Sequence, residues 1–314
     1  MPSSTHNPAT QIGGETQFFE WNWQNRTYSV AYETRGSGSP ILLLPAFSTV
    51  SSRTEMRGLA ESLSTQFQVV ALDWLGFGQS SRPALDYNPA LYQQLLRDFV
   101  AATFDTPVAV VAAGHAAGYA MQVAQQQPCP WSKIVLVAPT WKGPLRVMGA
   151  PTLVRNGVRK LVRSPLLGQL LYKLNTLPSF LHFMYRRHVY TNPEHLTPEF
   201  MAQKWQITQQ PGARYAPAAF VTGTLDPVQQ RTDFLNVFQT LSTPVMVVIG
   251  EQTPPKSKAE MEVLAHLTGV QVQHMSGSLG LHEEYVTALA EVLFPFLQDN
   301  VTPDPNNSDN QASR

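Results

Sequence analysis

The sequence predicts an α/β fold with a doubly wound, mostly parallel sheet. Short apolar runs of strand length alternate with helical segments of about 10–15 residues, which is the pattern of parallel βαβ units. The chain has 314 residues, of which 43% are hydrophobic, and this is enough for one sizeable core. It carries 22 Lys+Arg and 22 Asp+Glu, so no overall positive charge favours a nucleic-acid partner, and none is expected.

The elements follow from local patterns. Residues 17–34 are typical of a hairpin that turns at residues 24–26. The Asn88-Pro89 pair predicts a helix start, because Asn caps a helix and Pro fits its first position; Asp226-Pro227 predicts another. The further predicted strands are 41–44, 68–72, 108–112, 134–137, 245–249 and 270–274, and the predicted helices include 53–64, 89–104, 117–126, 257–267 and 283–297.

The alternation of strands and helices stops at Pro139 and resumes near Asp226. The interval is helical, interrupted by prolines and poor in strands, so we predict a helical cap inserted into the sheet domain at about 142–225. We call these residues the helical insertion. The α/β domain is expected to span 16–300, with polar, disordered tails at 1–15 and 301–314.

Cysteine content and hydropathy bear on cofactors and compartment. Cys129 is the only cysteine, so no internal disulfide and no multi-cysteine metal site is expected. No His/Asp/Glu cluster has metal-ligand spacing, and no cofactor is predicted. The N-terminus lacks the pattern of a secretory signal, and no apolar stretch reaches the roughly 18 residues of a membrane span. We expect a soluble, cytoplasmic protein that is at most peripheral to a membrane.

Four motifs, in order along the chain, resemble those of the α/β-hydrolase superfamily. Residues 73–80 match D-x-x-G-x-G-x-S, and residues 114–118 form a glycine-flanked turn where the family carries G-x-S-x-G. Residues 250–254 stand where the family has G-x-x-D-P, and 282–284 (His-Glu-Glu) open the last helix. The motifs are loosely similar to those of cyanobacterial and plastid members. The resemblance covers about residues 17–298 and implies a cap between the sixth and seventh strands.

The resemblance implies acyl transfer by a Ser, His and Asp/Glu triad, in which the histidine activates the serine and the acid orients the histidine. Ala116 matches the nucleophile and Thr253 the acid, and the alternative acid site at 139–141 has no carboxylate. Leu279 matches the catalytic histidine, whereas a three-residue shift of the loop makes His282 the base. We therefore expect a degenerate triad and a chain that has lost hydrolysis.

The other features of the site are expected to bind a ligand. The oxyanion-hole donors implied by the resemblance are the backbone N–H groups of Phe47 and Ala117, and the helix after the turn attracts anions or carbonyl oxygens. Candidate pocket residues are His115, Trp141 and His282, around a lipophilic or carbonyl-bearing small molecule. Two alternatives stay open: a hydrolase of esters or lipids in which His282 activates water, and a structural interaction protein with a filled pocket.

The helical insertion is basic. Residues 142–190 contain nine Lys/Arg and no Asp/Glu. On a helical wheel, residues 152–163 separate into an apolar half of Leu and Val and a basic half. The basic half consists of Arg155, Arg159, Lys160 and Arg163. We expect the apolar half to pack on the core, and the basic face to be solvated or to contact anionic lipid headgroups or an acidic partner protein.

Overall fold

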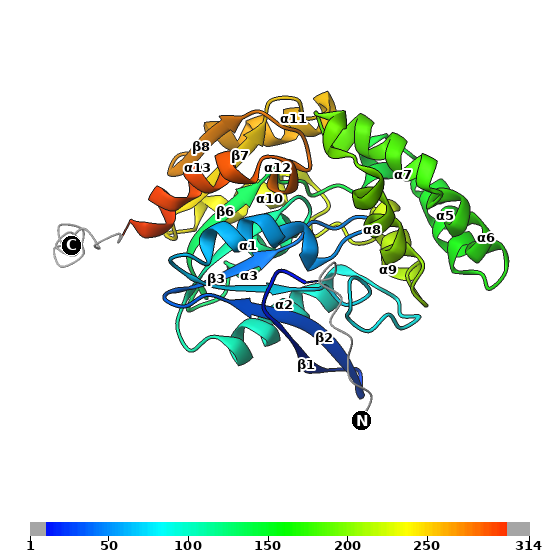
Figure 1. Cartoon of the computed structure of the whole chain (residues 1–314), viewed down its shortest axis with the longest axis horizontal. Coiled ribbons are helices and arrows are strands. Elements are labelled where there is room, and N and C mark those ends of the chain that lie inside the picture. Colours follow the sequence, from blue (N-terminus) through cyan, green and yellow to red (C-terminus); the bar gives the residue numbers. More distant parts are fainter. Residues whose placement is uncertain (1–10, 300–314) are drawn as a thin grey trace, which may run out of the picture.

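An eight-stranded sheet with the order β1-β2-β4-β3-β5-β6-β7-β8 runs through the molecule, and the computed structural model describes residues 11–299 (Figure 1). The pairs β1–β2 and β2–β4 are antiparallel and the other five are parallel, so the predicted α/β fold with a mostly parallel sheet is confirmed. The strands are β1 (Glu15–Trp23), β2 (Arg26–Arg35), β3 (Pro40–Leu44), β4 (Gln68–Leu72), β5 (Val108–Ala113), β6 (Trp131–Val137), β7 (Val245–Gly250) and β8 (Val270–Met275).

The predicted hairpin forms with its turn at the predicted place. Gln24 and Asn25 connect β1 to β2 with φ values of 48° and 62°, the left-handed conformation that a two-residue hairpin turn requires. Upstream of β1, Ile12 is buried and its N–H donates to Glu33 Oε2 at 2.8 Å. Residues 11–15 of the predicted N-terminal tail therefore pack on the domain, and the rest of both predicted tails lies outside the described residues.

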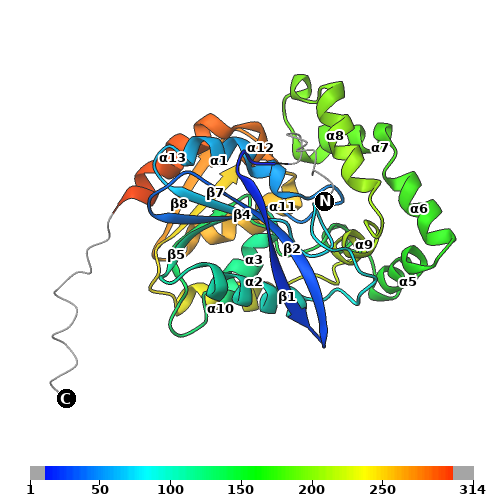
Figure 2. The same cartoon turned by 60° about the horizontal axis from the view of Figure 1, so that its bottom comes forward.

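Helices lie on both sides of the sheet. On one side α1 packs against α12 and α13, and on the other α3 packs against α2 and α10 (Figures 1 and 2). These helices are α1 (Arg57–Leu63), preceded by the 3₁₀ turn η2 (Arg53–Met56), α2 (Pro89–Thr103), α3 (Ala116–Val123), α10 (Arg231–Gln239), α11 (Pro255–Glu262), which is extended by η5 (Val263–His266), α12 (Leu281–Glu284) and α13 (Val286–Gln298).

One predicted helix start is right and the other is wrong. Asn88 caps α2, and its side chain accepts the Leu91 N–H at 3.1 Å. Asp226-Pro227 does not begin a helix, because the Asp226 carboxylate is buried and accepts the Gly143 N–H at 2.7 Å. The chain instead continues to α10, where Gln230 forms the N-cap of a capping box.

Between β6 and β7 the helical insertion forms a lobe beside the sheet, and α5 and α6 lie at its far end in both views (Figures 1 and 2). No helix among residues 11–299 has the length and apolarity needed to cross a bilayer. The helices of the lobe are α4 (Pro144–Val147), α5 (Thr152–Arg163), α6 (Leu167–Asn175), α7 (Pro178–Met184), the π-helical turn η3 (Tyr185–Val189), η4 (Pro193–His195), α8 (Pro198–Thr208) and α9 (Tyr215–Val221).

The orientation predicted for α5 is wrong. Its guanidinium groups turn inward: Arg155 donates to Thr222 O at 3.1 Å, Arg159 pairs with Asp86, and Arg163 donates to Leu85 O at 2.5 Å. Of the predicted basic half, Lys160 alone is exposed among these four side chains, whereas Leu153, Val154 and Leu161 of the apolar half face solvent. The helix takes this orientation because the segment before α2 and the end of α9 offer carbonyl and carboxylate acceptors.

Candidate functional site

The corner between β5 and α3 has its left-handed residue at Gly114, with a φ of 51°. His115 is already helical, with φ −71° and ψ −20°, and Ala116 is the first residue of α3. In α/β-hydrolases, which the sequence motifs resemble, the nucleophile occupies the strained residue of the strand-to-helix turn. Here the left-handed residue is Gly114, which has no side chain, and small residues, Ala112 and Ala116, lie two positions before and after it. The match of Ala116 to the nucleophile stays a prediction.

The corner residue faces the loop that follows β3. A Cβ atom added to Gly114 would lie 3.0 Å from Ala46 Cβ, next to the predicted oxyanion donor Phe47. The other predicted donor does not fit, because the Ala117 N–H donates to Gly114 O at 3.3 Å and is used inside the turn. The N–H that directly follows the corner belongs to His115.

Aromatic rings fill the space around Phe47. Its ring is 3% exposed and stacks on Trp74 with the ring centroids 4.9 Å apart. Tyr92 and Tyr119 approach the same ring at 5.0 and 5.4 Å, and Phe220 lies at 6.4 Å. Such clusters gain free energy from the burial of large apolar surfaces and from ring contacts. Phe47 is therefore part of a packed cluster, and it does not line either of the clefts described below.

His115 lies at the edge of the aromatic cluster. Its Nε2 is 3.0 Å from Leu225 O and 3.6 Å from Asp226 Oδ1, so Nε2 carries the proton that donates to the carbonyl. Burial lowers the pKa of His115 to about 4, and burial raises the pKa of Asp226 to about 6. Near neutral pH the imidazole is uncharged, and Asp226 pairs with Arg146 at 2.5 Å.

The loops after β7 and β8 lie against each other. The Gln252 N–H donates to Gly277 O at 3.0 Å, and the Gly277 N–H donates to the Gln252 side chain at 2.6 Å. Thr253 is buried on the first loop and its hydroxyl has no hydrogen-bond partner. Leu279 is half-buried on the second and packs on the core. Acid and base positions thus come from neighbouring loops, and neither residue carries a carboxylate or an imidazole; the assignment of Leu279 stays a prediction.

His282 contacts η2. It is buried, and its Nε2 lies 3.3 Å from Glu55 Oε1 without the alignment of a hydrogen bond. Glu55 also accepts the N–H of Ala46. Trp141, another predicted pocket residue, is buried and stacks on Phe234 with ring centroids 4.6 Å apart. None of His115, Trp141 and His282 lines either of the two clefts described below.

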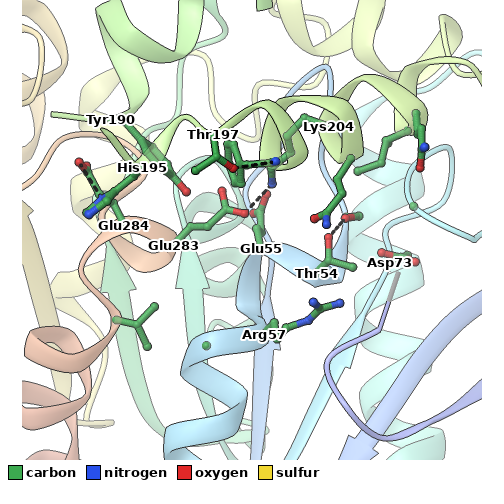
Figure 3. A pocket seen from close by; sticks show the side chains of 18 of the residues that line it. Thr54, Glu55, Arg57, Asp73, Tyr190, His195, Thr197, Lys204, Glu283 and Glu284 are labelled. Atoms are coloured by element: carbon green, nitrogen blue, oxygen red, sulfur yellow. Dashed lines mark hydrogen bonds and ion pairs between the residues drawn. The ribbon is translucent and has the colours of Figure 1, made fainter. Parts of the chain in front are cut away.

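A cleft of about 650 Å³ lies between the sheet domain and α8 of the helical insertion (Figure 3). Lys204 on α8 donates to Glu283 Oε1 at 2.6 Å, and the two side chains converge with Glu55 in the cleft. Burial, followed by the negative charge of Glu283, raises the pKa of the Tyr190 phenol far above its ordinary value. Most residues of the lining are polar or charged, and they include Thr54, Glu55, Arg57, Asp73, Gln79, Tyr190, His195, Thr197, Gln203, Lys204 and Glu283.

Beneath the cleft lies a buried ion network. Arg53 is fully buried and donates from Nε to Glu33 Oε1 at 2.7 Å, while its guanidinium also pairs with Asp73. Asp73 accepts the backbone N–H groups of Arg53 and Gln79 at 2.6 and 2.7 Å. Asp73, the first residue of the D-x-x-G-x-G-x-S segment, thus has a structural role here. Sequence reasoning missed this network because Glu33, Arg53 and Asp73 lie 20 residues apart in or beside different elements, and neither helix nor strand periodicity connects them.

A second, smaller cleft of about 430 Å³ lies within the helical insertion and is mainly apolar. Its lining includes His182, Leu196, Met201 and Trp205. Within the part of the chain that the structure describes, no group of three His, Cys, Asp or Glu residues is arranged to hold a metal ion.

Comparison with known proteins agrees with the fold. The model of the "Alpha/beta hydrolase family" matches residues 41–292, which is most of the chain. The chain belongs to this family. An uncharacterized protein of Mycobacterium tuberculosis is 35% identical over 111 residues, which are 35% of this chain and 32% of the relative. A 2-hydroxy-6-oxo-6-(2'-aminophenyl)hexa-2,4-dienoic acid hydrolase of Metapseudomonas resinovorans is 30% identical over 96 residues.

These matches to relatives are partial. The chain covers about a third of the length of the curated relatives, 32% of the mycobacterial protein and 33% of the Metapseudomonas hydrolase, while 29% of this chain matches the latter. The crystal structure of a probable hydrolytic enzyme of Pseudomonas aeruginosa aligns with a TM-score of 0.71 at 16% identity, covering 91% of this chain and 95% of that one. At this identity the likeness establishes the fold alone.

As an α/β-hydrolase-family protein, the chain keeps the scaffold that normally holds a triad. The corner, the loop after β3, and the paired loops after β7 and β8 are all present. The match of Ala116, Thr253 and Leu279 to the three triad positions of the family stays a prediction.

Proposed function

We propose that this α/β-hydrolase-family protein does not catalyse acyl transfer and acts as a binding protein. The observation that carries the proposal is Gly114 at the strand-to-helix corner. Covalent catalysis needs an oxygen or sulfur nucleophile at that residue, and glycine supplies no side-chain atom. Ala116, two residues later, is buried in α3 and supplies none either.

The surroundings of the corner support the same proposal. Phe47, next to the Ala46 that faces the corner, is packed among aromatic rings and lines neither cleft. Thr253 places an uncharged hydroxyl at the acid position, and a neutral group stabilises an imidazolium far less than a carboxylate does. Loss of both the nucleophile and the acid favours an altered function over a single inactivating change.

We place the proposed binding in the cleft of about 650 Å³ between the sheet domain and α8, which we call the polar cleft. It offers donors such as Lys204 on α8 and carboxylate acceptors such as Glu55 and Glu283 from the sheet domain. This lining suits a small molecule that combines a polar group, such as a carbonyl, with an apolar part, because Phe200, Ile207 and Val286 also line the cleft. A lipophilic ligand would have to use the apolar cleft beside Met201 and Trp205 instead.

The competing function is a hydrolase in which His282 activates water. A general base must reach its proton within hydrogen-bond distance, directly or through one water molecule. The His282 Nε2 faces Glu55, and the imidazole is not part of the cleft lining. The geometry therefore favours binding over this rearranged hydrolysis.

Hydrolysis of p-nitrophenyl butyrate by the purified full chain tests the proposal. We expect no turnover above the uncatalysed rate, and the His282→Gln variant is expected to behave identically. Turnover above about 1 per second, a low but ordinary enzyme rate, would overturn the proposal. Loss of such turnover in His282→Gln would establish the competing hydrolase.

Restoring the triad tests which residue is the nucleophile equivalent. We expect Gly114→Ser, combined with Ala46→Gly, Thr253→Asp and Leu279→His, to react with a fluorophosphonate probe. The matched control carries Ala116→Ser in place of Gly114→Ser and should not react, because Ala116 lies inside α3. Ala46→Gly is included because a side chain at residue 114 meets Ala46 Cβ. If only the variant with Ala116→Ser is labelled, Ala116 and not Gly114 is equivalent to the nucleophile.

Native mass spectrometry of the purified chain tests the site of binding. A co-purified small molecule should be lost when Gln203→Trp fills the mouth of the polar cleft. Gln209→Trp is the matched control, because Gln209 is exposed at the end of the same helix and does not line the cleft. A molecule retained by both variants would place binding elsewhere.

A further inference from the structure

The outer surface of the helical insertion exposes a concentration of large apolar side chains. Twelve of the fourteen exposed large apolar residues among residues 11–299 lie between 142 and 190, and the other two are Phe18 and Trp205. We call the set on α5–α7 the apolar face; its most exposed members are Leu153 and Leu166, which are 84% and 86% exposed. Scattered apolar residues are normal on a monomer, whereas a cluster over consecutive helices marks an interaction surface.

The leucines of α6 cannot turn inward without unpacking the lobe. Gly168 and Tyr172 are the buried residues of this helix, and they form the side that packs inward. A Cβ atom at Gly168 would lie 2.1 Å from Val162 O, so α6 is in close contact with the end of α5. The inward-facing guanidinium groups of α5, described above, fix the orientation of that helix. The packing of α5 and α6 therefore fixes the outward orientation of the apolar face.

Unpaired cations accompany the apolar face. Lys160, Lys173, Arg186 and Arg187 are exposed, and none of the four has a carboxylate within ion-pair distance in the described part of the chain. Residues 142–190 contain no Asp or Glu that could neutralise them. A partner that covers this face must therefore be apolar at its centre and negatively charged around it.

We propose that the apolar face docks this protein on the surface of an anionic lipid bilayer. Leucine and phenylalanine would enter the boundary between headgroups and acyl chains, and Lys160, Lys173 and the arginines would contact anionic headgroups. The helices are too short to span a bilayer. Figures 1 and 2 place α5 and α6 at the end of the lobe away from the sheet, so a flat membrane reaches them without meeting the sheet domain.

Two other occupants fit less well. A second copy of this chain would bring the same cations to both sides of the interface, and like charges repel. A protein partner would be expected to meet Trp, Tyr and Arg, which dominate the energetics of protein interfaces, whereas leucine is under-represented there. The leucine-rich surface with a basic margin instead has the composition of an interfacial membrane helix.

Sedimentation of the full chain with vesicles tests the docking. Vesicles of phosphatidylcholine containing phosphatidylserine should pellet the protein, vesicles of phosphatidylcholine alone should pellet much less, and added salt should release it. Leu170→Ser should weaken the sedimentation. Phe18→Ser is the matched control, because Phe18 is 55% and Leu170 is 56% exposed, and it should leave sedimentation unchanged. Lys160→Gln and Lys173→Gln should each weaken binding about fivefold, and Arg26→Gln, an exposed cation on the hairpin, should not.

Three outcomes overturn the proposal. The first is no sedimentation with anionic vesicles, and the second is equal sedimentation with neutral ones. The third is an equal loss in Leu170→Ser and Phe18→Ser. If the chain instead dimerises in solution, and Leu170→Ser abolishes the dimer without affecting vesicles, the apolar face is an interface between two copies. None of these outcomes depends on the polar cleft, so they leave the proposed binding function to its own tests.

Discussion

The sheet domain and the helical insertion both turn arginines inward, but they place their large apolar side chains in opposite ways. In the sheet domain Arg53 is fully buried and lies between Glu33 and Asp73, and apolar side chains surround the strands. In the insertion the arginines of α5 turn toward the domain, while leucines of α5 and α6 face solvent. Leucine side chains therefore contribute to the core in the sheet domain and to an exposed surface in the helical insertion.

The contrast shows why amphipathicity alone does not decide which side of a helix faces inward. An amphipathic helix buries its apolar half when the neighbouring surface is apolar. Around α5 the neighbouring surface presents Leu85 O, Asp86 and Thr222 O, which satisfy guanidinium donors. Polar acceptors at the contact thus determine the orientation, and the apolar half is left for another partner.

The largest expected effect concerns the buried network. Arg53→Met should lower the free energy of unfolding by about 3–5 kcal/mol, because it leaves two buried carboxylates without a counter-charge. Urea denaturation measures this loss. Arg231→Met is the matched control: it removes an Arg–carboxylate pair, to Glu260, in which the arginine is half exposed, and about 1 kcal/mol or less is expected. Equal losses in the two variants would contradict the contrast between buried and exposed charges.

The next largest effect is a pH dependence of the unfolding free energy, caused by His115 beside the corner between β5 and α3. Burial lowers the pKa of His115 to about 4 from an unfolded value of 6.5, so the unfolded chain binds more protons between these pH values. His115 therefore makes stability rise with pH in this window, by about 3 kcal/mol in total, and contributes no further change above pH 6.5. His115→Gln should remove this rise.

The measurement is the difference in unfolding free energy between wild type and His115→Gln from pH 4 to 7. The wild type alone is a poor probe, because Asp226 acts in the opposite direction. Burial raises its pKa to about 6 from 3.8, so the folded chain binds more protons in that interval and stability falls as pH rises. If the difference in unfolding free energy between wild type and His115→Gln does not change with pH, His115 has the same pKa in the folded and the unfolded chain.

A smaller effect is expected on α5. Arg159→Gln should lower the unfolding free energy by roughly 0.2–1 kcal/mol, since its partner Asp86 is exposed and water screens the pair. Lys160→Gln, the next residue on the same helix, is the control and should have no measurable effect. If Lys160→Gln is the more damaging of the two, α5 is rotated relative to the orientation described here.

Most of the sheet could be predicted from the sequence because apolar runs and turn residues act locally. Strand β4 matches the expected 68–72, and the Asn88 cap appears where it was expected. The Asp226-Pro227 start failed because a distant arginine, Arg146, and the Gly143 N–H captured the carboxylate. Local pattern decides where an element forms unless a tertiary partner competes for the same polar group.

The candidate site could be predicted only in part. The motif order located the corner between β5 and α3, whereas the sequence did not predict that Gly114 is its left-handed residue. The polar cleft has no sequence signal, because Glu55, Lys204 and Glu283 come from distant segments. Their proximity follows from how α8 of the insertion packs beside η2 and α12, which periodicity does not encode.

The smallest effect is also the most direct test of the outward-facing leucines. Leu166→Ala should change the unfolding free energy by no more than about 0.5 kcal/mol, because the side chain is already in water in the folded state. Leu43→Ala, the same deletion at a fully buried strand position, should cost about 2–5 kcal/mol through lost burial and the cavity it leaves. Urea denaturation of both variants, at several protein concentrations, provides the comparison. A loss above about 1 kcal/mol in Leu166→Ala that grows with concentration would mean that a second copy covers the leucine. A loss that is independent of concentration would mean that α6 packs against its own chain, and the apolar face would then no longer be a free surface.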